Sequence, residues 1–396
     1  MKTGKMKNMV LINKKSARKN KAIRIAQKEA NKYYGRTRGE APKLKINTMV
    51  SLSKNGYVSL LNDKTAYSQG LEQENGKHVS LIKGSDFISL IKESGLTGLS
   101  GNGFLTAEKL ETIQKSNVAK KILIVNSVEC DPVLVHDKWI LANKWEQVKR
   151  GIEILNQNLH FSNILLATKE KIQKEASELT LSNQNQVSML SIKTVPNRYP
   201  MGQEIQLIKN VLGIELSEQE IPASKGILVL NLQTVYAIAQ IVDKKEKVNS
   251  RFLTVADMNT AVAKTVEVFV GADIVKVIKG IFPGVTGQGI FAGGGIMSCH
   301  PVDENEKVTL QTNFITYGER TDYDAAQKCK NCGACATKCP VGVKVYKIVQ
   351  ALEKGQEGGF EEFYPEKCIG CGACTYVCHA GRNTQKDIAM VNGKLV

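Results

Sequence analysis

The sequence contains no run of about 18 consecutive apolar residues, which is the length that a membrane-spanning helix needs. It also shows no secretory signal, so its ten cysteines are not expected to pair as disulfides. The 396 residues are too many for one ordinary domain. We therefore expect a multidomain globular protein of the cytoplasm, where thiolates stay available to bind metal.

Most of the chain also lacks an excess of basic charge. The net charge is +16, but residues 1–45 hold fifteen of the 54 Lys and Arg and only two of the 38 Asp and Glu. The remaining residues keep an excess of only three positive charges, which argues against a nucleic-acid-binding surface. Residues 1–45 are predicted to form a basic N-terminal extension.

Three interpretations of this extension remain open. It is either a solvated charged segment or a segment that binds an acidic partner or anionic lipid on the cytoplasmic face of a membrane. An organellar presequence is disfavoured, because it would contain Arg and Ser in preference to Lys.

Eight of the ten cysteines lie in two copies of one pattern. The first copy contains Cys329, Cys332, Cys335 and Cys339, and the second contains Cys368, Cys371, Cys374 and Cys378. Both read C-x2-C-x2-C-x3-C, the spacing that holds cubane iron–sulfur clusters. Three thiolates at this spacing can bind three corners of a cluster, and Gly333 or Gly372 loosens the backbone between them. One difference is that His379 stands where the first copy has Pro340.

The fourth corner of each cluster has to come from elsewhere. In two-cluster ferredoxin modules the last Cys of each run ligates the other cluster, which assigns Cys378 to the first run and Cys339 to the second. Zinc is the competing interpretation, but zinc sites usually present paired C-x2-C knuckles without a middle Cys. We predict two [4Fe–4S] clusters in a ferredoxin-like domain at residues 320–396.

Between residue 80 and residue 246 short apolar strands alternate with amphipathic helices. The strands are expected at 122–125, 164–167 and 227–230, and the helices at 87–91, 148–155, 172–179 and 205–212. This alternation predicts a parallel sheet with helices packed on it. The charged stretch 243–247 is typical of a boundary, so the α/β domain is expected at 46–246.

Residues 247–319 are expected to form a small α+β domain. Strands are predicted at 252–255 and 266–270, with a helix over 274–278. A glycine-rich connection at 284–295 precedes the cysteine-rich segment.

Four polar segments of the α/β domain carry motifs. Gly98–Lys109 is a glycine-rich loop, Asn126–Pro132 reads N-x-x-E-x-D-P, Tyr199–Ile208 reads Y-P-x-G-x-E-x-Q-L-I, and Asn231–Thr234 reads N-x-x-T. Glycines let backbone N–H groups approach a phosphate. Asn126, Asn231 and Thr234 follow strands, near the carboxyl edge where open α/β sheets bind ligands.

In this order the segments resemble the C subunit of the Rnf electron-transport complex. The same core occurs in the cobalamin reductase of propanediol-utilising microcompartments and, more distantly, in the NADH- and flavin-binding subunit of respiratory complex I. The resemblance extends from about Val79 to Cys378. It implies a Rossmann-like flavin-binding domain, a β-grasp domain of the SLBB type and a bacterial-ferredoxin-type domain with two clusters.

The resemblance implies that the four polar segments bind FMN. The matching residues are Gly98, Gly101, Gly103, Phe104, Lys109, Asn126, Glu129, Glu204, Asn231 and Thr234. Each also has a plainer interpretation: the glycines as an ordinary loop, Asn126 and Thr234 as turn-forming residues, and the two glutamates as surface acids. Cys130 and Cys299 are more often buried thiols than reactive ones.

The function implied by the resemblance is electron transfer from NADH through FMN to two [4Fe–4S] clusters. The partner would be another subunit of a redox complex or a ferredoxin- or flavodoxin-type acceptor, which would make the chain part of an NADH-dependent oxidoreductase. A second interpretation is a cluster-only relay without NADH oxidation, because Ser100 and Asn102 add side chains where the family has almost none. A third is a structural scaffold whose clusters only hold the C-terminal domain together.

Overall fold

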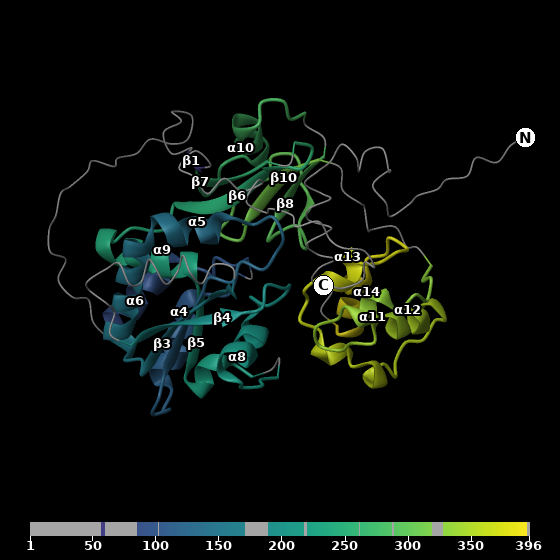
Figure 1. Cartoon of the computed structure of the whole chain (residues 1–396), viewed down its shortest axis with the longest axis horizontal. Helices are drawn as coiled ribbons and strands as arrows, with labels where there is room; N and C mark the ends of the chain where they lie inside the picture. The colour runs from purple at the N-terminus through teal and green to yellow at the C-terminus, as the bar shows by residue number, and fades with distance from the viewer. Residues whose placement is uncertain are drawn as a thin grey trace, which may run out of the picture. The chain divides into compact units, whose positions relative to one another are not determined.

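Figure 1 shows a computed structural model of the chain. It describes residues 57–59, 85–101, 103–170, 189–217, 220–260, 262–286, 289–318 and 328–393. The basic extension and the helix expected at 172–179 lie outside these residues. The described residues fall into two compact units, which we call the large unit, within 39–257 and 262–317, and the cysteine unit, which contains 328–393.

The large unit contains a four-stranded sheet (Figure 1). Its order is β4 (Leu190–Val195), β3 (Asn163–Lys169), β2 (Ile122–Asn126) and β5 (Ile227–Asn231), and all neighbours are parallel. The parallel sheet expected from the alternating pattern is therefore present. In the register of β2 and β5, Asn126 lies opposite Asn231, so the loops that follow these two strands begin side by side.

Alternate side chains of β2 enter different hydrophobic clusters. Leu123 and Val125 pack with residues of α3 (Ser85–Ser94), α4 (Thr106–Lys115), α6 (Trp145–Leu159) and α9 (Leu232–Lys244). Ile124 packs instead with Leu207 and Ile208 of α8 (Glu204–Leu212). A strand that is buried on both faces has to be apolar throughout, which explains the uninterrupted apolar run of β2.

The large unit also contains a six-stranded mixed sheet. Its order is β1 (Tyr57–Ser59), β7 (Val262–Phe269), β6 (Ser250–Asp257), β10 (Phe314–Tyr317), β8 (Ile290–Gly293) and β9 (His300–Pro301). Apolar residues of α10 (Ile274–Ile281) pack with those of this sheet. Strand β1 precedes the α/β segment in sequence yet pairs with β7, a pairing that the sequence did not predict.

The cysteine unit consists of two similar halves. In each half a Gly in the left-handed conformation (Gly333 at φ 69°, Gly372 at φ 74°) precedes a short helix. The helices are α11 (Ala334–Thr337) and α12 (Val345–Glu353) in the first half, and α13 (Ala373–Tyr376) and α14 (Thr384–Val391) in the second. No helix within the described ranges combines the length and the apolarity that crossing a bilayer requires.

Candidate functional site

The glycine-rich segment forms a tight loop directly before α4. The amide of Gly98 donates to the carbonyl of Phe104 at 2.8 Å, and Gly101 and Gly103 have φ angles of 102° and 69°. Leu105 precedes α4 without any side-chain hydrogen bond to the helix; the amide of Thr106 donates to the carbonyl of Leu96 at 2.9 Å, and no side chain caps the N–H groups that follow it in the first turn. A glycine loop that leads into an uncapped helix start is a common phosphate-binding arrangement.

A buried arginine on β6 holds this loop in place through hydrogen bonds. Arg251 on β6 is 2% exposed and donates to the carbonyl of Leu99 at 3.3 Å, to the carbonyl of Leu310 and to the Asn313 side chain. A Cβ at Gly101 would lie 3.0 Å from Asn313 Nδ2, so the loop packs tightly on the second sheet. Burial lowers the pKa of Arg251 to about 9.

The structure brings Phe104, Lys109 and Glu204 together beside the loop. Lys109 Nζ on α4 lies 2.6 Å from Glu204 Oε2 at the start of α8, and both side chains are largely covered. The ammonium group is 5.7 Å from the centre of the Phe104 ring, which is 44% exposed. A positively charged ammonium group and an accessible aromatic ring therefore lie beside the glycine-rich loop.

Three polar side chains connect the surrounding loops through hydrogen bonds, namely those of Asn126, Asn231 and Thr234. Asn126 donates to the carbonyl of Gly202 at 2.8 Å and accepts from the amide of Val128. Thr234 Oγ1 accepts from the amide of Leu99 at 3.0 Å. Asn231 caps α9, and Thr234 lies in the first turn of that helix rather than in a loop. These three side chains shape the site through hydrogen bonds within the protein.

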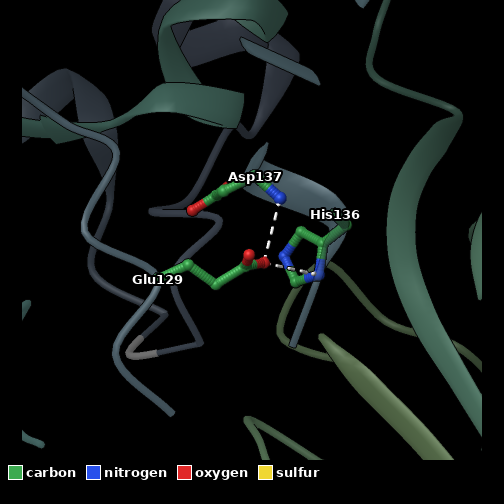
Figure 2. Close-up of side chains that lie close together, drawn as sticks. All are labelled: Glu129, His136 and Asp137. Carbon is green, nitrogen blue, oxygen red and sulfur yellow. Dashed lines mark hydrogen bonds and ion pairs between the residues drawn. The ribbon is translucent and has the colours of Figure 1, made fainter. Parts of the chain in front are cut away.

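Glu129 belongs to a buried cluster with two residues that the sequence did not single out (Figure 2). Glu129 Oε1 accepts from the amide of Asp137 at 3.0 Å and lies 3.5 Å from His136 Nδ1. Asp137 Oδ2 accepts from Asn231 Nδ2 at 2.7 Å. Figure 2 shows the Glu129 carboxylate facing the imidazole, whereas the Asp137 carboxylate points away from it.

Burial controls the ionisation of this cluster. It raises the pKa of both carboxyl groups, to about 8 for Asp137, and lowers the pKa of His136 to about 3. Backbone N–H groups favour the ionised form of Glu129. Asp137 Oδ1, in contrast, has no hydrogen-bond partner among the described residues. At neutral pH the Asp137 carboxyl is therefore protonated and His136 is neutral, and burial also shifts Glu129 toward its protonated form by raising its pKa.

The same three residues have the composition of a metal site, since their ligand atoms lie within 4.8 Å of one another. Their hydrogen bonds argue against that role. His136 Nδ1 shares a hydrogen bond with Thr254 Oγ1 at 3.0 Å, and Asp137 is bonded to Asn231. We assign the cluster to a proton-bearing hydrogen-bond network. No local spacing could have revealed it, because Thr254 is 118 residues from His136 in sequence.

The loops as a group fit a ligand with a phosphate and a polar ring edge. Among the described residues, Thr106 Oγ1, Ser127 Oγ and Gln233 Nε2 are buried polar atoms without a hydrogen-bond partner, and all three belong to these loops or the helix starts beside them. These three atoms are polar groups that the fold leaves unused, and the ammonium of Lys109 adds a positive charge beside them.

The cysteines gather in two crossed sets. One pocket of the cysteine unit is lined by Cys329, Cys332 and Cys335 of the first run together with Cys378 of the second. On the other side, Cys339 lies close enough to Cys371 and Cys374 to raise their pKa, as does Cys368. We call these sets the first cage, which contains Cys378, and the second cage, which contains Cys339.

The arrangement of the cysteines bears on the choice between zinc and a cluster. A zinc ion with bonds of about 2.3 Å holds its four sulfurs roughly 3.8 Å apart. Among the described residues, no three cysteine sulfurs lie within 4.8 Å of one another. In the described residues the cysteines are thus not gathered at the spacing of a single zinc ion, which agrees with the cluster spacing of their sequence.

Metal binding to the cages is coupled to proton release. Burial, together with the charges of neighbouring cysteines, raises the pKa of Cys335, Cys371 and Cys374 to about 12. These thiols keep their protons at neutral pH without metal, and ligation has to displace those protons.

Comparison with protein families identifies two domains. Residues 91–240 match the Nuo51 FMN-binding domain, and residues 321–379 match the 4Fe-4S dicluster domain. The chain therefore has an FMN-binding α/β domain and a C-terminal domain for [4Fe–4S] clusters, as its sequence predicted.

Similar proteins are named as the C subunit of an ion-translocating oxidoreductase complex. The relative from Haemophilus influenzae is 28% identical over 69% of this chain and 34% of its own length. The relative from Vibrio cholerae is 28% identical over 65% of this chain and 33% of its own length. The relative from Rhodobacter capsulatus is 26% identical over 68% of this chain and 52% of its own length. The chain thus spans about a third to a half of these relatives.

A similar fold occurs in a solved NAD+-reducing [NiFe]-hydrogenase in the H2-reduced state. The match has a TM-score of 0.52 at 16% identity and covers 78% of this chain and 62% of the hydrogenase chain. It supports the multidomain α/β architecture.

The buried proton on Asp137 predicts a pH-dependent stability. Between about pH 4 and pH 8 the folded chain holds this proton and the unfolded chain does not, so stability falls as pH rises. His136 contributes the opposite slope, from about pH 3 to pH 6.5, because its folded pKa is lowered. Asp137→Asn should therefore flatten the decline between pH 6.5 and 8, by up to about 1.4 kcal/mol per pH unit.

Urea unfolding followed by tryptophan fluorescence measures this slope, because both tryptophans, Trp139 and Trp145, lie in the large unit. Asp243→Asn is the matched control, since Asp243 forms an ion pair with Arg150 in which both side chains are about a third exposed. Equal slopes in the two variants and the unaltered chain would contradict the assignment of the proton.

Proposed function

We propose that this chain, a homologue of the C subunits of ion-translocating oxidoreductase complexes, passes electrons from NADH through FMN to two [4Fe–4S] clusters. The observation that carries the proposal is the presence of an FMN-binding domain and a two-cluster domain on one polypeptide. FMN is the cofactor that accepts a hydride and releases its two electrons singly. Clusters that accept one electron each are its natural partners.

In this proposal the flavin site is built from the loops at the carboxyl edge of the parallel sheet. Gly98, Gly101 and Gly103 let the backbone approach the phosphate, and Lys109 supplies a positive charge to it. Glu204 orients Lys109 through their 2.6 Å ion pair. Phe104 offers its exposed ring as an apolar contact.

The remaining flavin-site residues act by positioning. Asn126, Asn231 and Thr234 hold three loops in place through the hydrogen bonds described above. Glu129 orders the start of α5 (His136–Asn143) by accepting from the Asp137 amide. Their substitution is expected to weaken flavin binding by loosening the loops.

The eight cysteines ligate the two clusters in the crossed sets. Cys329, Cys332, Cys335 and Cys378 hold one cluster, and Cys339, Cys368, Cys371 and Cys374 hold the other. The pocket that joins Cys378 to the first run supports this assignment.

The electrons are proposed to leave through another subunit of a redox complex or a ferredoxin- or flavodoxin-type acceptor. The relatives are named as subunits of such a complex. The basic extension at residues 1–45 would contact an acidic partner or the anionic cytoplasmic face of a membrane, which would make the chain a peripheral protein. The proposed organisation is an extension at 1–45, a flavin domain at 46–246, a β-grasp domain at 247–319 and a cluster domain at 320–396.

A second candidate is a chain that binds FMN without oxidising NADH rapidly. Asp131 accepts from the amides of Ile296 and Met297, and Gly294 Cα would lie 3.5 Å from a Cβ at Gly101. The connection between β8 and β9 therefore packs against the flavin motifs, where it would restrict access by a dinucleotide.

The proposed function predicts about one FMN, eight iron and eight sulfide per anaerobically purified chain. NADH should bleach the flavin absorbance, and slow bleaching would favour the second candidate.

Lys109→Gln should lower FMN affinity by about tenfold to a hundredfold, because a hydrogen bond to a charged group contributes about 1.5–3 kcal/mol. Lys115→Gln on the same helix, where the side chain is 77% exposed, is the control and should bind FMN normally. If the purified protein contained no flavin under any condition, the proposal would be contradicted.

The crossed ligation predicts a non-local effect of one cysteine. Cys339→Ser should damage the cluster held by Cys368, Cys371 and Cys374, although Cys339 belongs to the first run in sequence. Electron paramagnetic resonance of the reduced protein distinguishes the two signals. Loss of the signal that Cys332→Ser also removes would show instead that each run keeps its own last cysteine.

A further inference from the structure

The two halves of the cysteine unit can be compared residue by residue. Cys368 follows Cys329 by 39 residues (368 minus 329), and Cys378 follows Cys339 by the same number (378 minus 339). Three residues after Cys339 and after Cys378, the last cysteine of each run, the chain has a Gly with nearly the same conformation, Gly342 at φ 80° and Gly381 at φ 73°. The same backbone path therefore leads from each run into the longer helix that follows it.

The side chains at one matched position differ sharply in charge. Val343 in the first half is 1% exposed and packs in the core of the unit with Ile348. Thirty-nine residues later these two positions are occupied by Arg382 and Asp387. Arg382 Nε donates to Asp387 Oδ2 at 2.6 Å, and Arg382 Nη2 donates to Asp387 Oδ1 at 2.9 Å. A bidentate ion pair has replaced an apolar pair.

This ion pair stands beside the first cage. Arg382 lines the pocket formed by Cys329, Cys332, Cys335 and Cys378. Its Nη1 also donates to Glu353 Oε1 at 3.0 Å, and the same oxygen accepts from the Cys329 amide at 2.8 Å. At the second cage the matched residue Val343 offers no charge, and its amide donates to Cys339 Sγ at 3.3 Å.

The environment of Arg382 keeps its charge close to the cage. The side chain is 15% exposed, so water screens it less than a surface charge. The hydrogen bond from Arg382 to Asp387 raises the pKa of the guanidinium above the usual value, so it stays protonated. Glu353 and Asp387 hold it in one orientation, and their two negative charges would face the first cage uncompensated without it.

We propose that Arg382 is a positioning residue that raises the reduction potential of the cluster in the first cage and makes the two clusters inequivalent. The proposal rests on the proposed function for the presence of the clusters. Reduction adds one electron and one negative charge to a cluster, and a fixed cation nearby stabilises the reduced form. The valine at the matched position of the second cage provides no such stabilisation.

A redox titration of the full chain, monitored by electron paramagnetic resonance, tests this inference. Arg382→Gln should lower the midpoint potential of one cluster by about 59 mV or more, a tenfold loss in its ratio of reduced to oxidised form at a fixed potential. The other cluster should keep its potential. Arg382→Lys retains the charge and should restore most of the difference. The signal that Cys332→Ser alters identifies the first-cage cluster.

Two further variants act as controls. Lys386→Gln removes one positive charge from α14, the helix that follows Arg382, but at an exposed position that does not line the pocket, and should shift neither potential. Asp387→Asn keeps Arg382 and removes a negative charge, so it should raise the potential of the same cluster. This opposite sign keeps the test decisive if Arg382→Gln loses its cluster.

The possible results separate the inference from the function on which it rests. Unchanged potentials in Arg382→Gln and Asp387→Asn, with both signals and full iron content retained, would overturn the role of Arg382. Equal shifts of both clusters, or an equal shift in Lys386→Gln, would also overturn it. Absence of iron from the unaltered chain would instead contradict the proposed function.

Discussion

The cysteine unit depends on one covalent requirement: each four-iron cluster needs four thiolates, and each cysteine run can place only three of them around one cage. The fourth has to cross from the other half, and the structure places Cys378 with the first run and Cys339 with the second. The small core of the unit includes Cys335 and Cys374, so packing and ligation involve the same residues. A unit of this size with so modest a core gains much of its stability from metal binding.

A different constraint organises the large unit. Parallel strands end at one edge, so the loops after β2 and β5 have to converge there. The polar groups of these loops are buried against the second sheet, and each needs a partner. Arg251 and Thr254 of that sheet supply partners to Leu99 and Val135, which ties the glycine loop and the start of α5 to a sheet encoded more than a hundred residues later. The loops of the proposed flavin site are thus held by both sheets.

Where the physical cause was local, the sequence was sufficient to predict the structure. The strands β2, β3 and β5 are short, continuous apolar runs, and the apolar spacing of α6 repeats every three or four residues. The cysteine spacing specified the cofactor as well as the domain. Strand β4 was missed because it is an edge strand with alternating exposed and half-covered residues. Helix α9 was missed because it begins immediately after β5, without any linking residue.

The parts of the site that could not be predicted depend on contacts between distant segments. His136 and Asp137 read as ordinary helix-start residues, and only folding against Thr254, Glu129 and Asn231 buries them. Arg251 stands in an apolar strand, where nothing in its neighbours indicates that it will reach Leu99. The asymmetry between Val343 and Arg382 is visible in the sequence, but its meaning depends on knowing which cage Arg382 lines.

The central claim is that the flavin and the clusters form one electron path within this chain. Rapid mixing of the anaerobic protein with NADH, followed in parallel by absorbance and by freeze-quench electron paramagnetic resonance, tests it most directly. The account predicts that flavin bleaching comes first and that the cluster signals grow afterwards, with a rate that falls in proportion when the flavin is depleted. Cluster reduction that is equally fast in flavin-free protein would contradict it.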